Sequence, residues 1–271
     1  MIIWIRNRKG WVGAVFFVLA AIFAASFIIG GVGTGSNASL SDIIGKNNGS
    51  ASTTSTAGIS TLEKRVKTNP KNAVAWAELA DAYATASRPS DEARAWGRVV
   101  ALKPTDMDSF QRLALAQAQV ATNQSNQAQQ LQQEALTASP GSDSTFTGGT
   151  LGSLSQDPVS QAQAASDATR QTKLLTQAST YSKKASFWWK QSTGTYGKIV
   201  QLPTFANNDL APTIWLNYGS AAQSANDTKT AIKAYEAFLK LAPDDVNAAQ
   251  VKTIVKQLKK STSSTSTGTS S

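Results

Sequence analysis

The sequence predicts an all-α fold, in which helical hairpins stack into a solenoid behind a single N-terminal transmembrane helix. Apolar side chains recur three or four positions apart in successive segments, which is the spacing of one helical face. Several of these segments end at a proline, which cannot continue a helix. A run of uncharged, mostly apolar residues at 11–33 precedes them all. The chain therefore divides into an apolar anchor, a polar stalk and a helical domain.

The predicted anchor comprises a basic flank at residues 1–10 and the apolar run at 11–33. Arg6, Arg8 and Lys9 stand in the flank, and the run contains no charged residue. About 20 apolar residues cross a bilayer as a helix, and the run is longer than the core of a secretory signal peptide. This favours an uncleaved anchor over a cleaved signal, for which Ala24-Ala25-Ser26 would be the small-residue site. Cationic flanks stay in the cytoplasm, so we expect the N-terminus inside and the remaining chain outside the cytoplasmic membrane.

Residues 34–58 are predicted to form a flexible stalk. Gly, Ser, Thr, Asn and Ala dominate the segment, and such a composition buries too little apolar surface to order itself. Residues 1–45 resemble the anchor of membrane-bound periplasmic prolyl isomerase chaperones. Nothing like their isomerase domain follows.

Residues 211–243 contain the clearest hairpin. One helical face precedes the Asn226-Asp227 turn, a second face follows it, and Pro243 ends the segment. Two amphipathic helices joined by a short turn form an αα-hairpin. The positions on the two faces are Trp215, Tyr218, Gly219 and Ala222, then Ala231, Tyr235, Phe238 and Leu239.

The order of these residues resembles a tetratricopeptide repeat, with Tyr218 and Ala222 as the main departures from its usual residues. A second unit shows the same spacing, because Trp76 precedes Pro104 by 28 residues, as Trp215 precedes Pro243. A third unit is predicted from Phe110, 34 residues after Trp76, to Pro140, with a slightly longer turn. Residues 59–70 resemble an isolated second helix. Repeats are therefore expected over 59–140.

A Gly/Ser-rich loop is predicted at 141–157, followed by a long basic helix from Pro158 to about Gln191. Residues 196–200 resemble a further second helix, so the repeats are expected to resume and to extend over 158–243. Trp188 and Trp189 are adjacent and cannot share one helical face. One ring is expected in the core. For the pair as a whole, the sequence is compatible with core packing, with contact to lipid headgroups and with contact to a partner protein.

The C-terminal part is predicted to cap the solenoid. Residues 244–260 show one apolar face and expose four lysines, as a terminal repeat with a polar outer side requires. Residues 261–271 contain only Ser, Thr and Gly and are expected to be disordered. The lysines are Lys252, Lys256, Lys259 and Lys260.

The composition argues against catalysis. The chain has no His and no Cys, so the commonest general base, thiolate chemistry and the commonest metal ligands are missing. The pairs Asp106/Asp108 and Asp244/Asp245 follow prolines that end helices, where carboxylates cap the next helix. We expect no enzyme activity, no cofactor and no metal. The net charge of +9 includes three cations of the N-terminal flank, and no nucleic-acid partner is expected.

The resemblance to tetratricopeptide repeats implies a protein-binding scaffold whose first helices line a concave groove for protein or peptide segments. The pattern lacks the Lys and Asn of the repeat clamps that hold a peptide carboxylate. We therefore expect a membrane-tethered scaffold for protein–protein interaction on the outer face of the cytoplasmic membrane. The alternative is an ancillary chaperone subunit of the secretion translocon. The candidate groove residues are Ala77, Glu78, Asp81, Gln111, Arg112, Leu216, Asn217 and Ser220.

Overall fold

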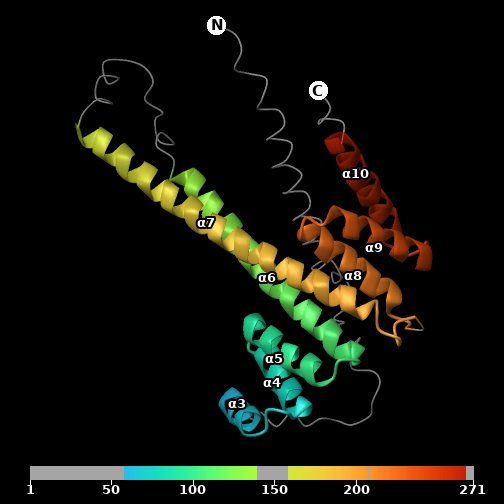
Figure 1. The fold of residues 1–271 in the computed structure, drawn as a ribbon. Coiled ribbons are helices and arrows are strands. Elements are labelled where there is room, and N and C mark those ends of the chain that lie inside the picture. The colour runs from blue at the N-terminus through green and yellow to red at the C-terminus, as the bar shows by residue number, and fades with distance from the viewer. Residues whose placement is uncertain (1–57, 139–157, 207, 267–271) are drawn as a thin grey trace.

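The computed structural model describes residues 58–138, 158–206 and 208–266, and within these ranges the regular structure is entirely α-helical (Figure 1). The predicted anchor at 11–33, almost all of the predicted stalk and the loop at 141–157 lie outside the described residues. No helix within the described ranges is both long enough and apolar enough to cross a membrane.

The first three helices are α3 (Ile59–Thr68), α4 (Ala73–Thr85) and α5 (Pro89–Leu102). Asn72 caps α4 by accepting a hydrogen bond from the Ala75 N–H at 3.1 Å. Ser87, with φ of 56°, makes the tight turn into α5. Leu79 and Trp96 are buried between these helices, and α3 packs on α4. The predicted hairpin and the isolated helix before it are confirmed.

The helix α6 (Met107–Thr137) corrects the prediction of a third hairpin. The expected turn contains neither Gly nor Pro, so no residue there interrupts a helix. The hydroxyls of Thr122 and Ser125 instead donate to the carbonyls of Ala118 and Ala121, both at 3.0 Å, within one continuous helix. The prediction of a turn was wrong because the spacing of the repeat outweighed this local evidence.

The helix α7 (Pro158–Ile199) corrects a second boundary. The segment at 196–200 was predicted as a separate second helix, but residues 196–199 are the end of the same 42-residue helix. Gly194 and Gly197 lie inside the helix without breaking it. The two long helices therefore replace the third predicted hairpin and the start of the fourth.

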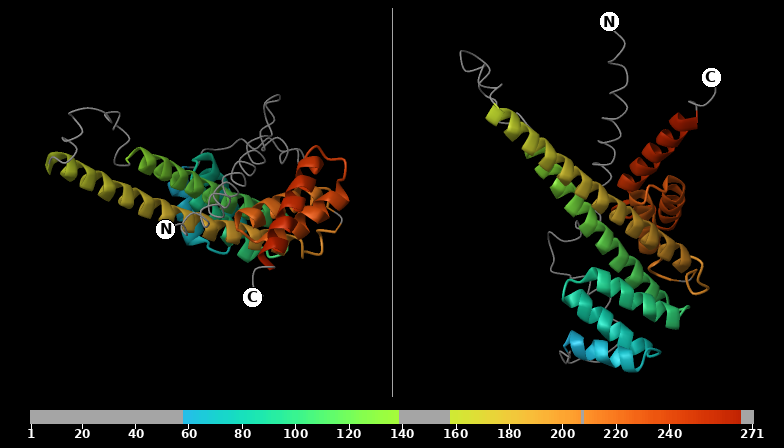
Figure 2. Two further views of the ribbon diagram at one scale, coloured as in Figure 1. Left: turned by 90° about the horizontal axis from the view of Figure 1, so that it is seen from above. Right: turned by 60° about the vertical axis from the view of Figure 1, so that its left-hand side comes forward.

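Helices α6 and α7 pair along their length in opposite directions (Figures 1 and 2). The Ser192 hydroxyl donates to the Ala114 carbonyl at 2.9 Å near one end, and Arg170 donates to Glu134 at 2.9 Å near the other. Buried and half-buried positions recur in steps of three and four in both helices, which is the heptad pattern of a coiled coil. In α6 they are Phe110, Ala114, Gln117, Ala121, Gln124, Ala128, Leu131 and Ala135; in α7 they are Gln171, Leu174, Ala178, Tyr181, Ala185, Trp188, Ser192, Thr195 and Ile199.

The last three helices are α8 (Ala211–Ser224), α9 (Thr228–Leu241) and α10 (Ala248–Ser266). Asn226, with φ of 60°, makes the turn between α8 and α9, and Asp227 caps α9 through the Thr230 N–H at 3.1 Å. Helix α10 packs on α9 and continues to Ser266. The segment 261–266, predicted to be disordered, is therefore helical. Residues 267–271 lie outside the described ranges.

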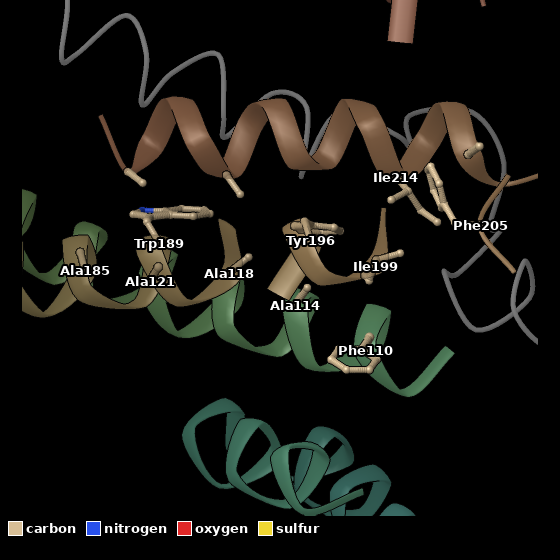
Figure 3. Packing of buried hydrophobic residues seen from close by; sticks show 13 residues of the cluster. Phe110, Ala114, Ala118, Ala121, Ala185, Trp189, Tyr196, Ile199, Phe205 and Ile214 are labelled. Atoms are coloured by element: carbon tan, nitrogen blue, oxygen red, sulfur yellow. The ribbon is translucent and has the colours of Figure 1, made fainter. Parts of the chain in front are cut away.

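The central core lies where α7 passes between α6 and α8. Figure 3 shows the rings of Trp189 and Tyr196 between α7 and α8, with Ala114, Ala118 and Ala121 of α6 on the other side. Small side chains on α6 allow this close approach, while large rings fill the wider gap to α8. The expected difference between the two tryptophans is confirmed, since Trp189 is buried and Trp188 is half-buried.

Candidate functional site

The predicted groove residues on α4 and α6 are largely used in contacts between helices. Arg112 donates to Asp81 on α4 at 3.2 Å and to Asp108 at 3.0 Å, and its guanidinium lies 5.1 Å from the Trp96 ring centroid. Glu78 accepts a hydrogen bond from Arg65 of α3. These side chains therefore join α3, α4 and α6 to one another.

Burial raises the pKa of the Asp81 carboxyl above its ordinary value, the nearby Arg112 lowers it, and Asp108 raises it again. Ala77 and Gln111, the other predicted positions on these two helices, are half-buried. This part of the predicted groove holds the helices together through ion pairs, while Glu78 and Asp81 remain exposed.

The predicted residues on α8 are also part of the packing. Leu216 and Ser220 are buried. Burial raises the pKa of the Tyr196 hydroxyl, and a hydrogen bond with Asn217 lowers it in part. Ser220 makes the corresponding hydrogen bond to Tyr235, whose pKa burial also raises. All three predicted α8 positions therefore support the helix hairpin or its contact with α7.

The order of packing explains why the predicted groove is not continuous. A concave groove needs the first helices of successive repeats side by side. Here α7 packs against both α6 and α8, so it takes the place beside α8 that the prediction gave to α6 (Figure 3). The positions on α4 and α6 and those on α8 consequently do not form one surface.

A different hollow opens where α7 runs past the turn between α8 and α9. This groove has a volume of about 760 Å³. A side chain at Gly194 would extend into open space, because nothing lies within 4 Å of an added Cβ. The lining mixes polar and apolar groups, as binding sites for protein segments do. The lining residues are Ser186, Lys190, Thr193, Gly194, Tyr218, Ala225, Asn226, Asp227 and Thr230.

Tyr218 gives the groove a fixed hydrogen-bonding group. Its ring stacks against Tyr196 at 6.3 Å and Trp215 at 5.9 Å between centroids. A Cβ at Gly197 would lie 3.1 Å from the Tyr218 hydroxyl oxygen, so glycine leaves room for that hydroxyl beside α7. Burial and the charge of Asp227 raise the pKa of Tyr218. The hydroxyl therefore stays protonated at neutral pH and can donate to a carbonyl of a bound chain.

The groove was missed at the sequence level, although two signals pointed to it. Tyr218 stands where a tetratricopeptide repeat usually has Leu, which places a hydroxyl at a position normally apolar. Gly194 and Gly197 interrupt an otherwise helix-favouring segment, and such glycines often mark a close approach or an open space. Within the described ranges, no cluster of three or more acidic residues could hold a metal ion.

Comparison with known proteins supports the repeat assignment in one part of the chain. Residues 212–245 match the family model of the tetratricopeptide repeat, and this range covers nearly all of α8 and α9. No curated protein matches the chain. Tetratricopeptide repeats are typically non-catalytic modules that bind protein or peptide segments, so the match supports a protein-interaction scaffold.

Proposed function

We propose that the protein is a membrane-tethered scaffold that binds partner proteins at the outer face of the cytoplasmic membrane. The observation that carries the binding part is the groove between α7 and the α8–α9 turn. It is open to solvent, it is framed by helices on two sides, and Tyr218 offers it a hydroxyl held in place by neighbouring rings. Helix-lined grooves of this kind accept segments of other proteins.

The membrane part of the proposal is supported by residues 1–58. Uncharged residues at 11–33 follow a cationic flank, and the 25 residues at 34–58 are mostly small and polar. The stalk predicted from this composition would reach roughly 25–30 Å from its anchor by random-coil scaling. A scaffold held at this distance would meet protein segments close to the membrane surface.

Photo-crosslinking in living cells tests the binding function. A photoreactive residue replaces Ser186 or Thr230 in the groove of the full-length chain, and Gln250, exposed on α10, serves as the control position. We expect one or two defined proteins to be trapped from the groove and not from Gln250. A broad mixture of newly exported chains with translocon subunits would instead support the ancillary chaperone. Trapping nothing from either groove position would refute both.

The same cells test the orientation. Because the chain contains no Cys, Thr262→Cys places a unique thiol at an exposed position of α10. We expect a maleimide that cannot cross the cytoplasmic membrane to label this thiol in cells whose outer envelope is permeabilised and whose cytoplasmic membrane is intact. Labelling that requires lysis of the cytoplasmic membrane would contradict the extracytoplasmic location of the helical domain.

A further inference from the structure

One lysine lines the groove, and two more stand on the helix faces that border it. Lys190 lines it, and Lys183 lies two helical turns earlier on the same side of α7. Lys233 follows Thr230 by one turn on α9, so it shares the face that borders the groove. All three are exposed, and the ion pairs among the described residues involve none of them.

The groove has a single acidic lining residue, and that residue is already engaged. Asp227 accepts the Thr230 N–H at 3.1 Å as the cap of α9, where its charge also interacts favourably with the helix dipole. Asp227 offsets one of the three lysine charges, so two positive charges remain in excess. This excess arises from the folded arrangement, because residues of both α7 and α9 line the groove.

The charge distribution along the chain reinforces this local excess. Residues 158–266 contain 13 Lys and Arg against six Asp and Glu, whereas residues 59–138 contain nine against eight. The half of the domain that contains the groove is therefore the basic half. A field of one sign over a hollow concentrates ligands of the opposite charge there.

We propose that the groove is specific for an extended acidic segment of a partner protein; this rests on the function proposed above and names its ligand class. Lys183 and Lys190 are seven residues apart on one helix, which separates their Cα atoms by about 10 Å. A chain in the extended polyproline II conformation covers about 9 Å in three residues and brings the side chains at both ends to the same face. The segment therefore carries acidic residues three positions apart, and a backbone carbonyl between them accepts from the Tyr218 hydroxyl.

The observations favour a protein segment over an anionic membrane surface. The groove is concave, whereas a bilayer offers a flat surface that cannot enter it. Aromatic side chains that anchor proteins in headgroups must be free to insert, yet Trp189 is buried and Trp188 packs against the core. Lysines at the rim of a hollow, with a hydrogen-bond donor inside, suit an extended chain.

Binding of defined peptides to the full-length chain in nanodiscs of zwitterionic lipid tests this specificity. The first probe is a fluorescein-labelled peptide of Ser, Thr and Val with two Glu three positions apart; the second carries Lys in place of Glu. We expect only the acidic peptide to bind, and more weakly as salt screens the charges. Each of Lys183→Gln and Lys190→Gln should weaken binding about two- to fivefold, the range for exposed ion pairs.

Matched variants separate the charge effect from other causes. Lys183→Glu with Lys190→Glu should abolish binding of the acidic peptide and permit binding of the basic one. Lys173→Glu changes the same charge on the same helix away from the groove and should leave binding unchanged. Gly194→Gln fills the groove, where an added side chain meets no neighbour, and should block the acidic peptide.

The outcomes distinguish the specificity from the scaffold function. If Gly194→Gln blocks the acidic peptide but the lysine variants change nothing, the groove binds protein and the acidic specificity is wrong. If the Lys173→Glu control weakens binding as much as Lys190→Glu, the effect is general charge and the proposal fails. Loss of acidic-peptide binding in nanodiscs of anionic lipid, with binding retained in zwitterionic nanodiscs at the same salt concentration, would show that the lysines contact the membrane instead. Crosslinks from the groove in cells test the scaffold function independently of these three peptide-binding outcomes.

Discussion

Replacing Gly219 by Ala should destabilise the α8–α9 hairpin, although Ala is normally the better helix former. A Cβ at this position would lie 2.5, 2.6 and 2.9 Å from three ring atoms of Tyr235. The ring has little room to move, because Tyr235 is fully buried and its hydroxyl donates to Gln223 at 2.8 Å. The glycine is therefore required by a helix–helix contact and not by its backbone conformation.

The magnitude follows from two opposing terms. Forcing an extra carbon into a packed interior costs about 1–3 kcal/mol, and the contact with a buried ring places Gly219 near the upper end. Replacing Gly by Ala inside a helix returns about 1 kcal/mol. We expect a net loss of about 2 kcal/mol for Gly219→Ala. Gly194→Ala and Gly97→Ala meet no neighbour within 4 Å, so each should gain about 1 kcal/mol.

Thermal unfolding followed by far-UV circular dichroism measures the difference between the variants. The free energies of unfolding of Gly219→Ala and Gly97→Ala should differ by about 3 kcal/mol, which corresponds to roughly 6–12 °C in Tm for a domain of this size. Because repeat domains can unfold in parts, hydrogen exchange should locate the loss in α8 and α9 and leave α4 and α5 unchanged. Equal stabilisation by Gly219→Ala and Gly97→Ala would refute the close packing of Tyr235 on α8.

Two further predictions concern charge and pH. Arg112→Gln should destabilise the protein by about 1–2 kcal/mol at neutral pH, because Asp81 and Asp108 lose their shared cation. This loss of stability should become smaller near pH 4, where carboxyls bind protons. A loss of stability that does not change with pH would contradict this prediction. Burial and a hydrogen bond to Glu63 raise the pKa of Tyr83 from 10.0 to about 12. Its contribution to stability is therefore complete below pH 10 and is lost as the pH rises to about 12, so urea unfolding of Tyr83→Phe should depend less on pH in this range.

The helices that follow the repeat spacing were predictable from sequence, and the two long helices were not. In α4, α5, α8 and α9 the apolar faces, the turns and the closing prolines all agree, so local and long-range signals point to one structure. In α6 the repeat resemblance predicted a turn between Phe110 and Pro140, while the sequence between them contained no glycine or proline. The local evidence was correct, because a helix continues wherever nothing interrupts it and a partner covers its apolar face.

The site was less predictable than the fold, for a reason that lies in packing. The groove positions of a repeat family can be assigned to a sequence only where the first helices of successive repeats lie side by side. Here α7 separates α6 from α8. Arg112 illustrates the consequence, since it was predicted to face a partner and instead joins α4 to α6 through Asp81. Which polar side chain meets a neighbouring helix depends on the crossing of helices distant in sequence. Sequence spacing alone contains no such information.

The heptad pairing of α6 and α7 explains both incorrect predictions, the turn within α6 and the continuous groove. It also accounts for the position of the observed groove. Alanines at four of the eight heptad positions of α6 let α7 approach closely along the pair. Helix α7 therefore stays straight past the end of α8 and does not turn back as the second helix of a short hairpin would. The space it borders beyond α8 is the groove, with Lys190 on one side and the α8–α9 turn on the other. Because α7 lies between α6 and α8, the described helices form no continuous concave surface, and α7 instead borders a hollow beside the matched repeat.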